Sequence, residues 1–561
     1  MSASLKMACC VIASAVVAAS LLPVQSEETV LNESAARTVP KAFDGLGEHG
    51  RKVTTKSDEA QKFFNQGLAF LYGFNHDEAI RLFQHAAALD PECAMAHWGI
   101  AYANGPHINF PLVDEPHAKA AWSALMKARE HVGNGTPAER DLIEALGKRY
   151  FDPQPTDRRS LDEAYAAVMR VLWQKYPDDA DIGALFAEAM MDLRPWDLWT
   201  KDGQPQPGTE EVLQTLETIL KKAPNHPLAL HLYVHAVEAS PNPEKAATAA
   251  DRLRSLQPGL GHMVHMPSHI DVRLGRWQAA IEANERAIKA DAEYRQAQPQ
   301  QNFFRLYMAH NHHMLAFAAM MQGQSKRSTD AISTMAAEMP EAWLVANAPF
   351  VDAMLAMPYE LHMRFGRWDE MLAEPEPRDI FPIARTIRHY GRGVSFAAKS
   401  DVENAKEEQR KFLAARDALP KEAMFTQNTA ADVLAVAEYM LAGEILFREG
   451  KVDESIAALR EAVRREDALR YIEPPDWIQP VRHALGATLV EAGRFSEAEQ
   501  VYRDDLKVYP ENGWSLYGLA GCLRKLRRDE EADAVSARFE KAWERADVKL
   551  SSSCYCLPGK K

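Results

Sequence analysis

The sequence predicts an all-α protein built from repeated pairs of helices, and three observations support this fold class. Hydrophobic residues make up 47% and charged residues 26% of the 561 residues, as in an ordinary folded protein. Ala, Leu, Glu and Arg dominate most stretches while runs of β-branched residues are scarce, and this mixture favours helices. Similar segments also recur along the chain at a fixed spacing, which is typical of stacked repeats.

The first 26 residues have the features of a secretory signal peptide. Lys6 precedes a short apolar run, and small residues ending at Ser26 come before an acidic segment. An uncleaved anchor is the less favoured alternative, because a spanning helix needs ~20 apolar residues and this run is shorter. We therefore expect cleavage after Ser26, a periplasmic or secreted protein, and no integral membrane segment after cleavage.

Charge and cysteine content limit the possible partners. The formal net charge is −14 and basic clusters are absent from the sequence, so nucleic acid is not an expected partner. Cys93 and Cys522 lie in helical patterns and are expected to be small buried hydrophobes. Cys554 and Cys556 lie in a polar tail, where they could form a strained disulfide or hold a soft metal; a tail without a role is the simpler interpretation.

The repeats place large, small and aromatic residues at fixed positions of two successive helices. The clearest copy supplies Phe63, Gly67, Phe70, Ala79, Phe83, Ala86 and Pro91. Further copies begin near residue 436, at Gln479 and at Trp514. Each of these residue types packs one helix against another or ends a repeat. The pattern resembles the tetratricopeptide-repeat (TPR) family, which implies a solenoid of helical hairpins in a right-handed superhelix, with degenerate repeats in its centre.

The expected organisation follows from the quality of the repeats and from the loops between them. We expect a signal peptide at 1–26, a polar lead-in at 27–55, N-terminal TPR repeats at 56–130, irregular helices and a loop at 131–210, degenerate TPR repeats at 211–400, C-terminal TPR repeats at 401–545 and a mobile tail at 546–561. Long loops at 103–117 and 193–210 are candidate lids over a binding site; the second contains Trp196.

Nine of the 19 histidines lie between His226 and His313. His231 and His235 are four residues apart, so they share one helical face. His265 and His269 form a second pair 34 residues later, and 34 residues is the length of one repeat. The TPR resemblance implies that histidines at groove positions line the concave surface together: His231, His235, His262, His265, His269, His310 and His313.

Glu238 also lies at a groove position, and Glu360 and His389 lie near groove positions of later copies. His97 and His107 do not lie at groove positions. Imidazole is the usual ligand for zinc or copper, so the cluster predicts a transition-metal site. Glu238 could be a ligand, could orient an imidazole, or could be a general base. The alternative is that the histidines are polar groove lining that forms hydrogen bonds without metal.

Three hypotheses of function follow. The first is an exported TPR protein that binds a metal or a metal-dependent ligand in its groove; the second is a metalloenzyme in which that metal activates water or oxygen. The third is a metal-free scaffold for a peptide or protein. A scaffold should have an open groove, whereas an enzyme should close it into a pocket for a small molecule.

Familiar catalytic motifs such as HExxH, Gly-x-Ser-x-Gly and a phosphate-binding Gly-rich loop are absent from the sequence. The segments GLAFLYGFNHDEAIRLF, MDLRPWDLW, HMPSHI and HNHHM resemble a group of exported bacterial TPR proteins. This resemblance supports the fold and the groove site over most of the mature chain and implies no particular reaction.

Overall fold

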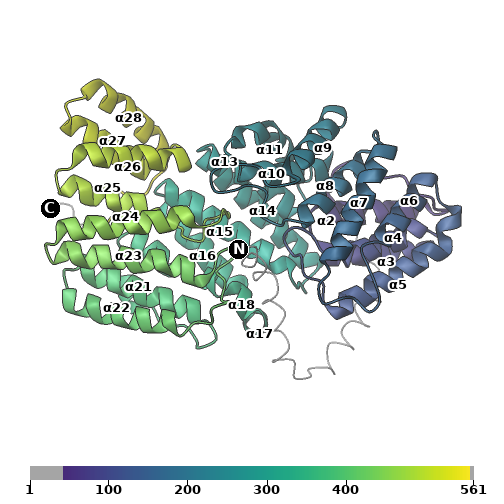
Figure 1. Ribbon diagram of the computed structural model, residues 1–561, viewed down its shortest axis with the longest axis horizontal. Coiled ribbons are helices and arrows are strands. Elements are labelled where there is room, and N and C mark those ends of the chain that lie inside the picture. The colour runs from purple at the N-terminus through teal and green to yellow at the C-terminus, as the bar shows by residue number, and fades with distance from the viewer. Residues whose placement is uncertain (1–41, 556–561) are drawn as a thin grey trace, which may run out of the picture. The chain divides into compact units, whose positions relative to one another are not determined.

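The computed structural model describes residues 42–555 (Figure 1). Every regular element in this part of the chain is a helix, and only isolated bridges join loop residues. The predicted all-α, TPR-type fold class is therefore confirmed. The signal peptide predicted at 1–26 lies outside the described residues. No helix between residues 42 and 555 combines the length and apolar character of a membrane span.

The chain forms two compact units. Unit 1 comprises the residues up to Met266 together with Lys289–Arg305. Its α-helices are α2 (Asp58–Tyr72), α3 (His76–Leu89), α4 (Ala94–Ala103), α5 (Glu115–His131), α6 (Pro137–Leu146), α7 (Arg159–Lys175), α8 (Ala180–Asp192), α9 (Thr209–Lys222), α10 (Pro227–Glu238), α11 (Ala247–Leu253) and α12 (Gly261–His265).

Unit 2 comprises Pro267–Ile288 and the residues from Leu306 onwards. Its helices begin with α13 (Pro267–Arg273). Helix α14 (Trp277–Ala297) lies partly in unit 2 and partly in unit 1, whereas nearly all of α15 (Phe304–Met321) lies in unit 2. There follow α16 (Ser325–Glu338), α17 (Glu341–Ala346), α18 (Ala348–Val351), α19 (Met357–Arg364), α20 (Trp368–Ala373), α21 (Pro382–Ala398), α22 (Val402–Asp417), α23 (Ala430–Arg448), α24 (Val452–Ala468), α25 (Val481–Glu491), α26 (Phe495–Val508), α27 (Gly513–Lys525) and α28 (Asp529–Ala542). Figure 1 shows α21 to α28 as successive stacked pairs of helices.

Glycines on the first helix of a pair admit an aromatic ring from the second helix. A Cβ atom at Gly67 or at Gly99 would lie 2.7 Å from the ring of Phe83. In unit 2 a Cβ atom at Gly518 would lie 2.2 Å from the ring of Tyr502. The glycine and aromatic positions of the repeat pattern therefore form the contacts that hold the helices of neighbouring pairs close together.

The strap, residues 42–57, runs in an irregular conformation across unit 1 and belongs to the lead-in expected at 27–55. The guanidinium of Arg51 donates two hydrogen bonds of 2.8 Å to Asp179, the N-cap of α8. Thr54 donates from its backbone nitrogen and its hydroxyl to Glu139 of α6, both at 2.7 Å. The carbonyl of Gly45 accepts from the backbone nitrogen of Gly259 at 2.9 Å, just before α12. The strap thus joins segments of unit 1 that are far apart in sequence.

Residues 546–555, part of the segment expected to be a mobile tail, form hydrogen bonds with other parts of unit 2. The carboxylate of Asp547 accepts from the backbone nitrogens of Ser325 and Lys326 at 2.7 and 2.8 Å, where α16 begins. Ser553 is buried and its hydroxyl donates to the carbonyl of His483 at 2.9 Å. The polar composition that suggested mobility supplies these hydrogen bonds to helix ends.

The cysteines divide into two kinds. Cys93 and Cys522 are buried and free, as expected. Cys554 is buried and disulfide-bonded, while Cys556 lies outside the described residues.

Candidate metal centre

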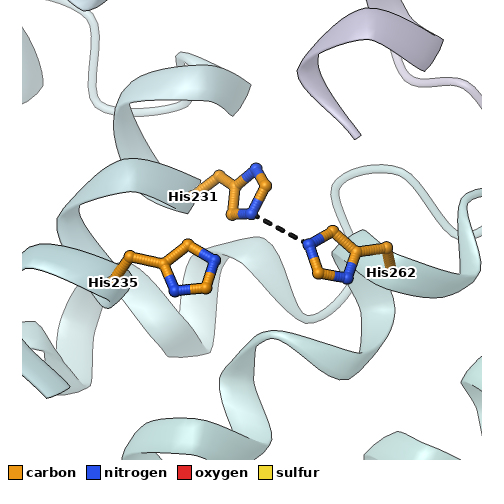
Figure 2. A group of neighbouring side chains, drawn as sticks. All are labelled: His231, His235 and His262. Atoms are coloured by element: carbon orange, nitrogen blue, oxygen red, sulfur yellow. Dashed lines mark hydrogen bonds between the residues drawn. The ribbon is translucent and has the colours of Figure 1, made fainter. Parts of the chain in front are cut away.

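Three of the predicted histidines converge in unit 1. His231 and His235 lie one turn apart on α10, and His262 lies on α12 (Figure 2). Their exposed fractions are 0%, 7% and 2%. One ring nitrogen from each of the three lies within 4.8 Å of the others, so a small shift of the rings would bring all three within ~2.0–2.1 Å of a single ion.

Hydrogen bonds from behind orient two of these rings. Nδ1 of His231 lies 2.8 Å from the carbonyl oxygen of Tyr72, and Nδ1 of His235 lies 2.8 Å from Oε1 of Glu238. A carbonyl or carboxylate oxygen only accepts, so Nδ1 carries the hydrogen and Nε2 of the neutral ring keeps its lone pair. Metal-binding histidines are usually oriented in this way by an acceptor behind the ring.

The third ring faces the first. Nε2 of His262 lies 3.1 Å from Nε2 of His231, the contact drawn in Figure 2. Two nitrogens bound to one tetrahedral zinc at ~2.0–2.1 Å would lie ~3.3 Å apart. The observed separation is thus close to what a shared zinc requires.

Local sequence explains why α10 and the end of α2 meet here. Pro227 occupies the first turn of α10 and the ring of His226 caps the helix by accepting from the nitrogen of Ala229 at 3.2 Å. All residues of α10 are buried. Apart from His231, His235 and Glu238, its side chains are mostly apolar. Helix α2 ends at Tyr72, so the carbonyl of Tyr72 has no partner in a following turn and can accept from His231.

Two aromatic residues with unusual backbone conformations border the three histidines. Phe74 and Trp196 both have φ of 57°, which is uncommon for residues other than glycine. The Phe74 ring lies 4.3 Å from that of His231 and 5.7 Å from that of His262, and the Trp196 ring lies edge-on to His235 at 5.4 Å. Phe74 lies in the turn between α2 and α3, and the corresponding turns of later helix pairs also contain a residue with positive φ, such as Gly323 or Ser400.

The two candidate lid loops are fixed by hydrogen bonds beside the histidines. Nε1 of Trp196 donates to Oδ1 of Asn109 at 3.1 Å, which joins the loops to each other. Nε1 of Trp199 donates to the carbonyl of Ala236 on α10 at 2.8 Å. The second loop therefore contacts the part of α10 that carries His235, and the first loop is joined to the second.

A buried ion pair holds the first of these loops in place. Nη2 of Arg149 donates to the carbonyl of Pro106 at 2.8 Å and to Oδ2 of Asp192 at 2.6 Å. The Arg149 guanidinium also lies over the rings of Tyr102 and Tyr165, at 4.9 and 4.8 Å. The loop position therefore does not depend on the histidine that follows Pro106.

The other predicted histidines are placed differently. His265 is buried on α12, with its ring 5.9 Å from that of His262. In unit 2 the rings of His269 and His310 lie 5.9 Å apart. Burial lowers the pKa of His313, also in unit 2, to about 4.

The lesser candidates from the sequence analysis, His97, His389 and Glu360, interact with groups close to them. Nε2 of His97 lies 3.0 Å from the carbonyl of Pro91, and Nδ1 of His389 lies 2.7 Å from Oε2 of Glu408. Glu360 is buried, and burial together with the charge of Asp476 raises its pKa to about 8.

A second group of possible ligands, His49, Asp181 and His226, was not anticipated. Oδ1 of Asp181 accepts from His49, His226 and Tyr72 at 3.0, 3.1 and 2.7 Å, and Oδ2 accepts from Arg51 at 3.1 Å. Burial alone would raise the pKa of Asp181, but hydrogen bonds from His226 and His49 outweigh burial and hold it well below its usual value. Because Arg51 already neutralises this carboxylate, we interpret the group as the anchor of the strap.

Sequence reasoning also missed His76 and His107. His107 was set aside because it does not lie at a groove position, but it lies in a loop and the repeat register does not apply there. Its ring lies 4.8 Å from that of Phe74. Burial lowers its pKa well below the usual value, and the neighbouring His76, Arg149, His231 and His235 lower it further. The interruption of the repeats by the segment GPHINFPLVDEP was the available signal.

Two segments of the chain match a known repeat family. Residues 64–104 and 483–542 match the tetratricopeptide repeat. None of the curated proteins matches this chain in sequence. Among solved structures, the APC/C hetero-tetramer Cut9-Hcn1 is 13% identical with a TM-score of 0.32, over 83% of this chain and 76% of that one.

Two further solved structures score similarly. The human IFIT1 dimer with m7Gppp-AAAA is 13% identical with a TM-score of 0.32, over 87% of this chain and 91% of that one. Yeast Tom70 is 11% identical with a TM-score of 0.27, over 88% of this chain and 91% of that one. Scores this low support no inference about function.

The sequence matches fall on helix pairs of both units, and the glycine and aromatic contacts of the repeat pattern are present in each. A repeat scaffold of this kind suggests protein or peptide partners. Residues 64–104 and 483–542 are therefore tetratricopeptide repeats, and the fold is of the TPR type.

Proposed function

We propose that this TPR protein binds a transition-metal ion, zinc or copper, through Nε2 of His231, His235 and His262. The observation that carries the proposal is the convergence of three buried ring nitrogens within 4.8 Å of one another. An imidazole-only donor set suits zinc and copper better than calcium or magnesium, which prefer oxygen ligands.

The arrangement fits a metal better than it fits plain groove lining. Groove lining would need only hydrogen bonds, whereas here the acceptors Tyr72 and Glu238 leave Nε2 of His231 and His235 directed toward the same neighbourhood. Glu238 is engaged with His235, which supports the role of orienting that ring over the role of general base.

Metal-dependent chemistry is the second candidate function. Three protein ligands leave a fourth position of a tetrahedral ion for water or a substrate, as in catalytic zinc sites. The fixed loops with Trp196 and Trp199 favour an enclosed site for a small molecule over an open peptide groove in unit 1. A bound ion would supply a Lewis acid that polarises water or a carbonyl group.

Export is part of the same proposal and rests on the leader at 1–26. An exported site meets metal ions directly from the surroundings. N-terminal sequencing of the mature protein should begin at Glu27, directly after Ser26.

Metal analysis of the mature, tag-free protein tests the proposal. After reconstitution with zinc or copper and removal of loose metal, the wild type should hold stoichiometric metal, and His231→Ala/His262→Ala should lose the ion bound there. The matched control is His97→Ala/His117→Ala, which removes two imidazoles of unit 1 outside the centre. A wild type without bound metal, or a triad variant with undiminished metal, contradicts the proposal.

A further inference from the structure

Two more histidines of unit 1 lie next to the candidate centre. His76 is the first residue of α3, and His107 lies in the loop after α4. Their ring centroids are 4.4 Å apart. Among residues 42–555 they belong to no group with three ligand atoms, so they are distinct from the three-histidine set.

His76 presents a lone pair that no described group uses. Its Nδ1 lies 2.9 Å from the carbonyl oxygen of Ala103, so Nδ1 carries the hydrogen and Nε2 of the neutral ring is an acceptor. Nε2 is buried and has no hydrogen-bond partner in the described part of the chain.

His107 likewise has a ring nitrogen whose hydrogen-bonding capacity is not used by the described residues. It is 3% exposed, and its Nδ1 is buried without a hydrogen-bond partner among residues 42–555. A buried polar atom without a partner costs about 1–3 kcal/mol, so two in adjacent rings point to a bound species that satisfies both.

One aromatic ring links these two histidines to the other three. The Phe74 ring lies 4.8 Å from that of His107 and 6.4 Å from that of His76. The same ring borders His231, His235 and His262, with centroids between 4.3 and 6.3 Å away. Five imidazoles thus surround one phenyl ring whose backbone is held at a positive φ.

We propose that His76 and His107 hold a second transition-metal ion, through Nε2 and Nδ1 respectively, so that unit 1 contains a two-metal centre. This inference rests on the proposed function, which supplies the neighbouring ion. Water or a small bridging ligand would complete the coordination of the second ion, as at other paired metal sites.

The loop that carries His107 is positioned independently of its ring. Arg149 holds the carbonyl of Pro106, and Trp196 holds the side chain of Asn109. Substitution of His107 by glutamine, which keeps a polar side chain of similar length, should therefore leave the loop in place.

The test compares metal content and electron paramagnetic resonance of copper-loaded variants. We expect two ions per chain in the wild type and one in His76→Gln/His107→Gln, as well as in either single variant. Two neighbouring Cu(II) ions couple magnetically, so the wild type should show a weakened or half-field signal. The pair variant should instead show an uncoupled signal equal to its copper content.

The outcomes separate this inference from the proposed function. If His76→Gln/His107→Gln binds as many ions as the wild type, the second site does not exist. If that variant loses an ion while His231→Ala/His262→Ala retains the full content, the second site stands and the proposed function fails. His97→Gln/His131→Gln, a pair of neighbouring histidines elsewhere in unit 1, is the control and should match the wild type in content and signal.

Discussion

Nε2 of His231 lies 3.1 Å from Nε2 of His262, although the two residues come from different helices. Nδ1 of His231 donates to Tyr72, so Nε2 of His231 is the acceptor and His262 must provide the hydrogen between them. A metal ion would replace that hydrogen with two coordinate bonds and would require little movement of either ring. The contact between these two ring nitrogens therefore supports the proposed metal site.

Glu238 should set metal affinity through His235. Glu238→Gln keeps the shape of the side chain but removes the charge that favours hydrogen on Nδ1 of His235, so affinity should fall by about 10–100-fold. Competition with a chromophoric chelator measures the change. Glu217→Gln is the control, because Glu217 on α9 accepts a hydrogen bond from Tyr233 on α10 and is not among the hydrogen-bond partners of the three histidines. Equal losses of affinity in both variants would contradict the role assigned to Glu238.

Arg51 should stabilise unit 1 by anchoring the strap. Arg51→Ala leaves Asp179 without two hydrogen bonds and removes the charge beside Asp181, and loss of one partner of a mostly buried pair costs about 3 kcal/mol. Thermal or urea unfolding should show a clear loss of stability. Arg494→Ala removes a surface ion pair with Glu497 and should leave unfolding unchanged; a similar effect of both substitutions would argue against the anchor.

Glu360 should make the stability of unit 2 fall as pH rises. Its pKa is raised from 4.5 to about 8 by burial and by the charge of Asp476. In this range the unfolded chain loses the proton that the folded chain keeps, so stability decreases between about pH 4.5 and 8 and levels off above.

Glu360→Gln mimics the neutral acid at every pH. It should match the wild type near pH 4 and exceed its stability at pH 8 by on the order of 2–5 kcal/mol. Unfolding curves at several pH values give the comparison, with the exposed Glu403→Gln as control. A difference between Glu360→Gln and the wild type that does not vary with pH would contradict the raised pKa.

Two glycines of α27 should respond oppositely to the same substitution. At Gly518 a Cβ atom would lie 2.2 Å from the Tyr502 ring, so Gly518→Ala should destabilise unit 2 by about 1–3 kcal/mol. At Gly521 nothing lies within 4 Å, so Gly521→Ala should stabilise it by about 0.5–1 kcal/mol. Unfolding of the two variants side by side measures both effects, and a stable Gly518→Ala would show that the ring is free to move.

The fold could be predicted because its determinants are local. Gly67, Phe83 and the other repeat positions occur at fixed spacing, and each one forms a contact between neighbouring helices. The pairing of His231 with His235 on one face was likewise available from their spacing on a helix.

The rest of the centre depends on contacts that no spacing encodes. His107 and Trp196 reach the site from irregular loops, and the acceptor behind His231 is a backbone carbonyl rather than a side chain. Residues 546–555 likewise form hydrogen bonds with residues far away in sequence, such as those at the start of α16. Tertiary hydrogen bonds of this kind cannot be inferred from periodicity.

X-ray absorption spectroscopy at the zinc edge of the zinc-loaded protein identifies the atoms that bind the ion. The first shell should contain imidazole nitrogens at ~2.0–2.1 Å with their outer-ring scattering, and this contribution should be reduced in His231→Ala/His262→Ala. A first shell made only of oxygen, or an imidazole contribution that is unchanged in that variant, would show that the three histidines do not bind the ion.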